Sequence, residues 1–178
     1  PLLLQLMFWY FVVFLGLKNK FINFTNILKI NNQGIEFFGF SLTPEFSALF
    51  IGLSFFTSAF IGEVIRGGII SVEKGQWESF RSLGLSERDG LIKVIIPQAL
   101  PAIIPGLTSQ YLNLAKNSTL AIAIGYSDIY AINDTIINQT GRAIECFIIL
   151  LLTFLILNLL ITNLMEKINK LINKKQIY

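Results

Sequence analysis

Apolar stretches with few or no charges recur along the chain, each close to the length that a helix needs to cross a lipid bilayer. A crossing takes roughly 20 apolar residues, because the hydrocarbon core is about 30 Å thick. The stretches are residues 1–17, 46–65, 94–115 and 146–165, and the last is the richest in Leu, Ile and Phe. This pattern predicts an all-α membrane protein whose residues 1–178 form one transmembrane domain with about four spans.

The first stretch is apolar from its start, and the first charge of the chain is Lys18. A secretory signal peptide would carry positive residues before its apolar core and small residues at a cleavage site after it. We therefore interpret residues 1–17 as a genuine span that is trimmed at its beginning.

Lys and Arg are unevenly distributed between these stretches. Because short loops rich in Lys and Arg stay in the cytoplasm, their distribution predicts the orientation. One side receives Arg66, Lys74, Arg81, Arg88, Lys93, Lys167, Lys170, Lys174 and Lys175, and the other receives Lys18, Lys20, Lys29, Lys116 and Arg142. The bias predicts a cytoplasmic loop after the second span, a cytoplasmic C-terminus, and outer segments at 18–45 and 116–142. The turn-forming residues of 18–45 predict a loop, whereas residues 118–130 predict a short re-entrant or interfacial helix.

The composition narrows the function classes. Apolar residues make up 53% of the chain, charged residues only 14%, and the mean hydropathy is +0.64, which favours a membrane protein and disfavours a nucleic-acid surface. There is no His and a single Cys, Cys146, so the chain offers no His-based catalysis, disulfide framework or Cys/His metal site. No G-x-x-x-x-G-K-[ST] motif occurs, so any ATP must be bound by another chain, and no cofactor or metal is expected here.

The predicted cytoplasmic loop, residues 66–97, is patterned like a helix followed by a bend. Three apolar residues recur at every third position and share one face of the expected helix: Trp77, Phe80 and Leu83. Gly84 is expected to end this helix and Pro97 to open the next span. Such an element can present an apolar ridge to a partner's groove. A solvated connector with an incidental amphipathic turn is the alternative that patterning alone leaves open.

Two resemblances decide between these alternatives. The residues Glu78, Ser79, Phe80, Gly84, Val94, Ile96 and Pro97 resemble the Glu-Ala-Ala, three residues, Gly, nine residues, Ile-x-Leu-Pro loop of ABC importer permeases, with Ser79 and Phe80 in place of the two alanines. Residues 1–5, 111–120, 123–126 and 138–145 resemble the polar and general L-amino-acid permeases. Together these likenesses cover essentially the whole chain.

The resemblance implies a MetI-like helical bundle with five spans in the intact subunit, of which one earlier span is missing here. It further implies a bacterial inner membrane location, a second permease subunit, cytoplasmic ABC ATPase subunits that hold the ATPase activity, and an extracytoplasmic amino-acid-binding protein. The loop that would couple to the ATPase is Trp77, Glu78, Ser79, Phe80, Arg81, Gly84 and Pro97. Within it, Glu78 is expected to hold the helix start, Arg81 to pair with the ATPase, and Gly84 to allow the bend.

Polar residues inside spans are candidates for a translocation path, because a lipid-facing polar group is costly. The candidates are Ser54, Thr57, Ser58, Thr108, Ser109, Gln110, Asn113 and Lys116. For each of the uncharged ones, an interhelical hydrogen bond is the competing interpretation. Glu63 and Arg66, three residues apart, are expected to form a structural ion pair rather than a gate.

Three other function classes compete with an importer subunit. A non-transporting membrane scaffold would use the amphipathic loop to hold a cytoplasmic partner. An intramembrane enzyme is disfavoured because the chain has no His and no Gly-x-Ser-x-Gly elbow. An ion-driven transporter would need intramembrane carboxylates, and only Glu63 and Glu145 come close, both at the ends of spans.

Overall fold

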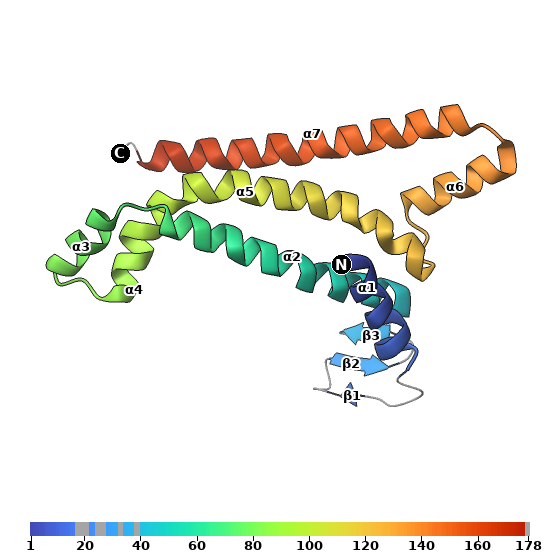
Figure 1. The fold of residues 1–178 in the computed structure, drawn as a ribbon, viewed down its shortest axis with the longest axis horizontal. Coiled ribbons are helices and arrows are strands. Elements are labelled where there is room, and N and C mark those ends of the chain that lie inside the picture. Colours follow the sequence, from blue (N-terminus) through green and yellow to red (C-terminus); the bar gives the residue numbers. More distant parts are fainter. Residues whose placement is uncertain (17–21, 24–27, 32–33, 38–39, 177–178) are drawn as a thin grey trace. The chain divides into compact units, whose positions relative to one another are not determined.

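The computed structural model describes residues 1–16, 22–23, 28–31, 34–37 and 40–176 (Figure 1). The chain divides into two compact units. Unit 1 contains Pro1–Thr57 and Leu114–Leu155, and unit 2 contains Ser58–Asn113 and Ile156–Tyr178. Each unit is described by itself below.

Three helices of the described residues are long and apolar enough to cross a membrane: Pro44–Ile70, Glu87–Ile124 and Ala143–Ile172. The first is α2, and the last lies within α7 (Ala143–Gln176). The middle one joins four helical pieces: α4 (Glu87–Gly90), the π-helix η2 (Leu91–Ile95), α5 (Ile96–Asn117) and the 3₁₀ helix η3 (Ser118–Ile124). The predicted stretches 46–65, 94–115 and 146–165 each fall inside one of these helices, as the apolar pattern requires.

The first predicted span is helical but short. Helix α1 (Leu2–Met7) continues as the π-helix η1 (Phe8–Phe14), and the apolar helix Leu2–Phe14 as a whole is shorter than the other three. At 1.5 Å per residue it measures about 20 Å, less than the roughly 30 Å of a bilayer core. Among the described residues, therefore, three helices have the length of a crossing instead of the four predicted from apolar runs.

The core of unit 1 forms where α1 and η1 pack on the start of α2. Leu6 and Phe14 are fully buried there, together with Ala48 of α2. A Cβ on Gly52 would lie 2.6 Å from Cδ2 of Leu6, so the absence of a side chain lets the two helices approach closely. The rings of Trp9 and Phe55 stack beside this contact, with centroids 5.8 Å apart.

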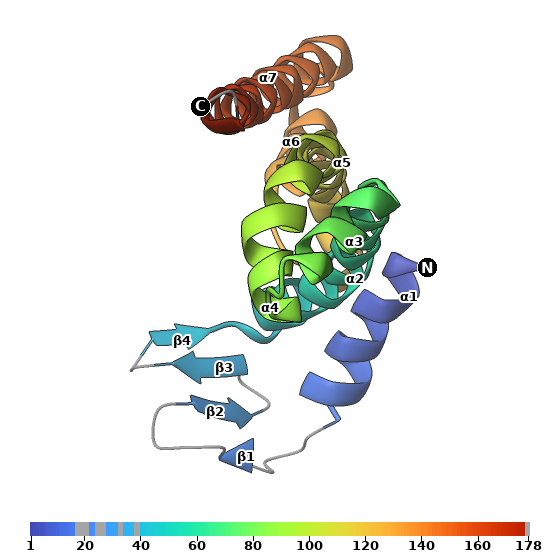
Figure 2. The ribbon, with the colours of Figure 1, turned by 90° about the vertical axis from the view of Figure 1, so that its left-hand side faces the viewer.

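Residues 18–45 were predicted to be a loop, and this prediction is wrong for the part of the segment that the structure describes. Four short strands, β1 (Ile22–Asn23), β2 (Leu28–Asn31), β3 (Gly34–Phe37) and β4 (Phe40–Leu42), form an antiparallel sheet in that order (Figure 2). Strands of two to four residues are too short to show an alternating pattern, which is why no strand was predicted in this segment. The N–H of Ile35 donates to Oγ of Ser47, which anchors β3 to α2.

The outer segment 116–142 contains two short helices in place of the single one predicted at 118–130. Helix η3 ends at Gly125, whose φ of +75° is the left-handed conformation that favours glycine. Asp128 then starts α6 (Ile129–Thr140), because its carboxylate accepts the N–H of Ala131 at 2.8 Å. Gly141, with a φ of +70°, ends α6 before α7 begins.

The core of unit 2 joins the end of α2 to α5 and to the short helix α3 (Lys74–Ser82). Its fully buried members are Phe80, Ile95 and Ala99. Glycines bring α2 and α5 together: a Cβ on Gly68 would overlap the side chain of Ile103, and one on Gly106 would lie 2.6 Å from Cγ1 of Val64. This core holds the segment between the two helices in place.

Candidate functional site

The connection from α2 to α5, residues 71–95, is called here the interhelical segment, and it is built as two helices around a bend. Helix α3 ends in a pair of backbone hydrogen bonds, from Gly84 N–H to the Arg81 carbonyl at 3.0 Å and from Leu85 N–H to the Phe80 carbonyl at 3.2 Å. These two bonds define a Schellman motif, which needs a left-handed residue at Gly84, and its φ is +72°. A Cβ on Gly84 would meet nothing within 4 Å, so the backbone conformation alone calls for glycine.

The second helix of the segment starts at Glu87, well before Pro97. Oγ of Ser86 accepts the N–H of Asp89 at 3.1 Å, and the Ser86 hydroxyl donates to the Asp89 carboxylate at 2.7 Å, so Ser86 caps the helix. The prediction that Pro97 opens the span is therefore wrong, because the helix is already formed when Pro97 is reached. In an α-helix the ring of Pro97 would conflict with the carbonyl of Lys93, and the wider π turn of η2 lies at that position.

The apolar face predicted for α3 points mostly into its own unit. Phe80 is only 1% exposed and its ring covers Gly90, where a Cβ would overlap it. Trp77 is half-buried, with its ring centroid 5.9 Å from that of Phe80. Only Leu83, at 75% exposed, faces outward. The expected ridge of three residues is thus corrected to one exposed leucine, because Phe80 and Trp77 bury their apolar surface against α4 and η2.

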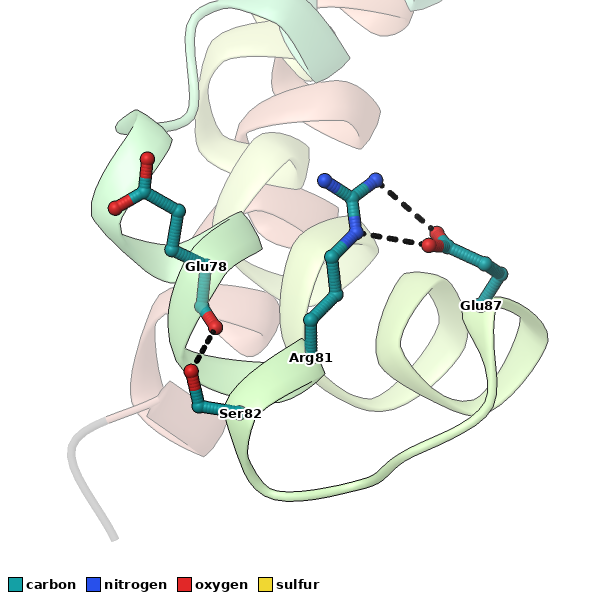
Figure 3. A network of polar contacts seen from close by, with 4 residues as sticks. All are labelled: Glu78, Arg81, Ser82 and Glu87. Atoms are coloured by element: carbon teal, nitrogen blue, oxygen red, sulfur yellow. Dashed lines mark hydrogen bonds and ion pairs between the residues drawn. The ribbon is translucent and has the colours of Figure 1, made fainter.

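Arg81 and Glu87 connect α3 to α4 across the bend (Figure 3). Nε of Arg81 lies 2.8 Å from Oε1 of Glu87, and its Nη2 lies 3.4 Å from Oε2. The guanidinium also lies over the rings of Phe80 and Trp77, at 5.6 and 5.8 Å from their centroids. The hydrogen bond to Glu87, followed by its negative charge, raises the pKa of Arg81. Arg81, expected to pair with another chain, is therefore already paired within this one.

Glu78 does not hold the start of α3, so this prediction is wrong. The N-cap of the helix is Glu73, whose side chain makes no capping bond, and Glu78 lies in the middle of α3. The Glu78 carbonyl accepts the hydroxyl of Ser82 at 2.9 Å, and its carboxylate points away from the Arg81–Glu87 pair (Figure 3). Glu78, Ser79 and Leu83 are exposed and form the outer face of α3.

The residues predicted to line a path are divided between the two units. Unit 1 holds Ser54, Thr57 and Lys116, of which only Thr57 is buried, at 8% exposed. Unit 2 holds Ser58, Thr108, Ser109, Gln110 and Asn113, of which Thr108 and Gln110 are half-buried and the others exposed. The hydroxyl of Thr108 donates to the Ile104 carbonyl at 2.9 Å, and that of Ser109 donates to the Pro105 carbonyl at 3.4 Å.

Unit 2 also contains a cavity of about 240 Å³. Of the residues that line it, only Thr108 is among the path residues predicted from the sequence. Its walls come from α5 and α7: Ile104, Pro105, Thr108, Thr162, Met165, Glu166 and Asn169. The signal that could have revealed it lies in α7, where Asn158, Thr162, Met165 and Asn169 follow one another at helical spacing along one face of a helix otherwise rich in Leu and Ile. The side-chain oxygens of Asn158 and Asn169 are buried and have no hydrogen-bond partner among the described residues.

The ion pair predicted between Glu63 and Arg66 is present near the end of α2. The Arg66 guanidinium donates two hydrogen bonds to the carboxylate, one of them from Nε to Oε2 at 2.9 Å. Both side chains are more than half exposed in the chain, at 64% and 62%. The predicted ion pair is therefore present, and its structural role stays a prediction.

The helical membrane architecture and the bent interhelical segment are those of a transport-system membrane component. Residues 1–174 match the family of the binding-protein-dependent transport system inner membrane component. The chain belongs to this family and is a multi-pass membrane protein. The resemblance to ABC importer permeases and the MetI-like fold are thereby confirmed.

The names of individual relatives describe amino-acid transport. The chain is 52% identical over 126 residues to the general L-amino acid transport system permease protein AapQ of Rhizobium johnstonii, covering 71% of this chain and 32% of that protein. It is 53% identical over 133 residues to the putative amino-acid ABC transporter permease protein YhdX of Escherichia coli, covering 74% and 34%. The chain thus spans about a third of the length of these curated relatives.

A solved structure shares the fold. The crystal structure of an amino acid ABC transporter with histidines superposes with a TM-score of 0.70 at 30% sequence identity, covering 96% of this chain and 69% of that one.

Proposed function

We propose that this chain is part of the permease subunit of an ATP-binding-cassette importer that carries amino acids, of the polar or general L-amino-acid type, across the bacterial inner membrane. The names of the relatives support the substrate class, and the family supports the importer. ATP hydrolysis belongs to separate cytoplasmic ATPase subunits, and the permease converts their movement into opening and closing of a path.

The observation that carries this proposal is the attachment of α3 to α5 through Phe80. Phe80 comes from α3, contacts Gly90 at the end of α4, and belongs to one buried cluster with Ile95 of η2 and Ala99 of α5. A displacement of α3 is therefore passed to the start of α5 through close-packed side chains. A solvated connector would leave α3 free to move without shifting the span.

The outer face of α3, made by Glu78, Ser79 and Leu83, is the surface we assign to the ATPase. Beyond it, η2 and the prolines at 97, 101 and 105 interrupt the regular hydrogen-bond ladder of the span. Such a helix bends more easily than an uninterrupted one, which suits a span that must tilt during alternating access.

The remaining partners follow from this assignment. The interhelical segment and the C-terminus face the cytoplasm, as the distribution of Lys and Arg supports. A second permease subunit completes the membrane part, identical or different, and an extracytoplasmic amino-acid-binding protein delivers substrate on the opposite side.

The test is transport by the assembled complex, with its ATPase, binding protein and full-length permease, in liposomes. We expect labelled L-amino acids to accumulate only with ATP, and the loaded binding protein to stimulate hydrolysis. Gly84→Asp and Gly84→Val, which disturb the bend, are expected to lower uptake more than hydrolysis. Uptake that proceeds without ATP would overturn the proposal. It would also be overturned if no ATPase co-purified with the permease.

A further inference from the structure

A second contact joins α3 to α5, one helical turn before Phe80. Nε2 of Gln98, in the first turn of α5, donates a hydrogen bond to Oε1 of Gln76 in α3 at 3.0 Å. The two glutamines are 22 residues apart along the chain, and the bend at Gly84, α4 and η2 lie between them. The hydrogen bond therefore links the two helices directly, without passing through the rest of the interhelical segment.

The two contacts lie on one face of α3. Gln76 and Phe80 are four residues apart in this helix, so their side chains leave it on the same side, about 6 Å apart along its axis. Their partners are also neighbours, because Gln98 precedes Ala99 directly and follows Ile95 by three residues. Helix α3 is thus held at two points, by a polar contact in its first turn and by an apolar contact one turn later.

The two points differ in their access to water. Phe80 is buried, whereas Gln98 is exposed and Gln76 is half-buried. A close-packed ring resists displacement because a gap beside it would forfeit its contacts. An exposed amide pair adds little to stability, because water competes for the same donors and acceptors. Its contribution is geometric: with Phe80 as the single point of attachment, α3 could turn about that point, and the amide pair removes this freedom.

We propose that Gln76 and Gln98 are positioning residues for the coupling step, in which movement of α3 shifts the start of α5. Their hydrogen bond fixes the orientation of α3 about Phe80, so that a push on the outer face of α3 moves α5 instead of turning α3 in place. This inference rests on the proposed function, because it concerns how ATP hydrolysis in another subunit is converted into transport.

The chemistry of the amide pair allows variants that keep or remove the bond. Gln76→Glu keeps it, because a carboxylate accepts the N–H of Gln98. Gln98→Glu also keeps it, once the Gln76 amide turns its NH₂ group toward the carboxylate. Gln76→Glu combined with Gln98→Glu, called here the two-acceptor variant, has no donor, and its two negative charges repel each other. Gln76→Glu combined with Gln98→Lys has a donor again and opposite charges. Gln76→Met and Gln98→Met remove the bond with little change in side-chain length.

Lys74 provides the matched control for charge. It is the first residue of α3, two positions before Gln76, and it is exposed. Lys74→Glu lowers the net charge by two, as the two-acceptor variant does. It therefore reports the effect of added negative charge at this end of α3 while leaving the amide pair unchanged.

The experiment measures how many amino acids are imported per ATP hydrolysed by the full-length permease, its ATPase and the loaded binding protein in liposomes. The substrate is a labelled mixture of the common L-amino acids. We expect Gln76→Met, Gln98→Met and the two-acceptor variant to lower this ratio by about fivefold, which corresponds to one hydrogen bond of about 1 kcal/mol. Each single change to Glu, Gln76→Glu combined with Gln98→Lys, and Lys74→Glu are expected to keep the wild-type ratio. Melting temperatures should stay within about 2 °C of the wild type, because the pair is exposed.

Several results would overturn this role while leaving ATP-driven uptake by the wild type intact. A wild-type ratio in the two-acceptor variant would show that the bond is not needed. Equal losses in Gln76→Glu and Gln76→Met would show that glutamine itself is required and not the bond. A loss in Lys74→Glu equal to that in the two-acceptor variant would assign the effect to charge, and ratios that fall in parallel with melting temperatures would assign it to stability. Failure of the wild-type complex to import any amino acid would instead overturn the proposed function.

Discussion

Arg81 and Glu87 face each other across the bend at Gly84, with Nε and Oε1 2.8 Å apart, and thereby tie α3 to α4. Both side chains are more than half exposed, so solvent screens the attraction and the pair adds little to stability. Its consequence is geometric, because it fixes the angle at which α3 presents its outer face.

Reversing this pair is the first prediction. Arg81→Glu alone places two carboxylates next to each other, and we expect ATP-dependent uptake to fall while the melting temperature of the complex stays within about 2 °C of the wild type. The double variant Arg81→Glu with Glu87→Arg restores opposite charges and should recover part of the uptake. If uptake is equally low in the single and double variants, Arg81 acts through a partner and not through Glu87.

The contact between Phe80 and Gly90 gives a second prediction. Phe80→Ala removes a fully buried ring, which typically costs about 3–5 kcal/mol. Gly90→Ala introduces a methyl group that overlaps this ring, although Gly90 has an ordinary helical φ of −60°. Combining the two should be less destabilising than the sum, because the methyl group occupies space that the ring has vacated. Thermal unfolding of the purified complex for all four proteins measures the coupling, and simple additivity would contradict the contact.

The third prediction tests whether glycine is needed at position 84 for its backbone conformation or for lack of room for a side chain. Gly84→Ala meets no neighbouring atom but forces an L-residue into the left-handed region, at a cost of about 1–2 kcal/mol. Gly75 lies inside α3, also has open space around it, and takes no left-handed conformation. Gly75→Ala is therefore expected to be neutral or stabilising by up to about 1 kcal/mol. Thermal unfolding of the two variants distinguishes the cases, and equal effects would show that the bend does not depend on glycine.

The sequence predicted the large features of the fold because they follow from runs of similar residues. Apolar stretches with few or no charges located α2, α5 and α7, and the spacing around Gly84 located the bend. Neither depends on contacts between distant residues. The sheet at 22–42 escaped prediction because its strands are too short for a period, and their pairing is made by backbone groups that every residue carries.

The roles of single residues in the interhelical segment could not be predicted from spacing. A three-residue repeat places Trp77, Phe80 and Leu83 on one side of the helix. It does not show whether that side packs against a partner or against the rest of this chain. The answer depends on Gly90, which provides room for the Phe80 ring. The partner of Arg81 was missed for the same reason, since Glu87 reaches it only once the bend has formed. The cavity was missed because its polar residues are spread over α5 and α7.

Adjacent glycines near the end of α2 give the fourth prediction. A Cβ on Gly68 would overlap the side chain of Ile103 and approach the Ala99 carbonyl, whereas a Cβ on Gly67 would meet nothing within 4 Å. Both lie in one continuous helix, so both alanine substitutions gain the same helix propensity. Gly68→Ala must nevertheless push α5 away from α2, and overpacking of this kind costs about 1–3 kcal/mol. We expect Gly68→Ala to lower the melting temperature and the uptake of the complex, and Gly67→Ala to leave the melting temperature unchanged or higher. Ile103→Ala removes the side chain that the new methyl group would strike, so adding it to Gly68→Ala should restore part of the loss. Absence of any rescue would mean that α2 and α5 do not approach each other at Gly68.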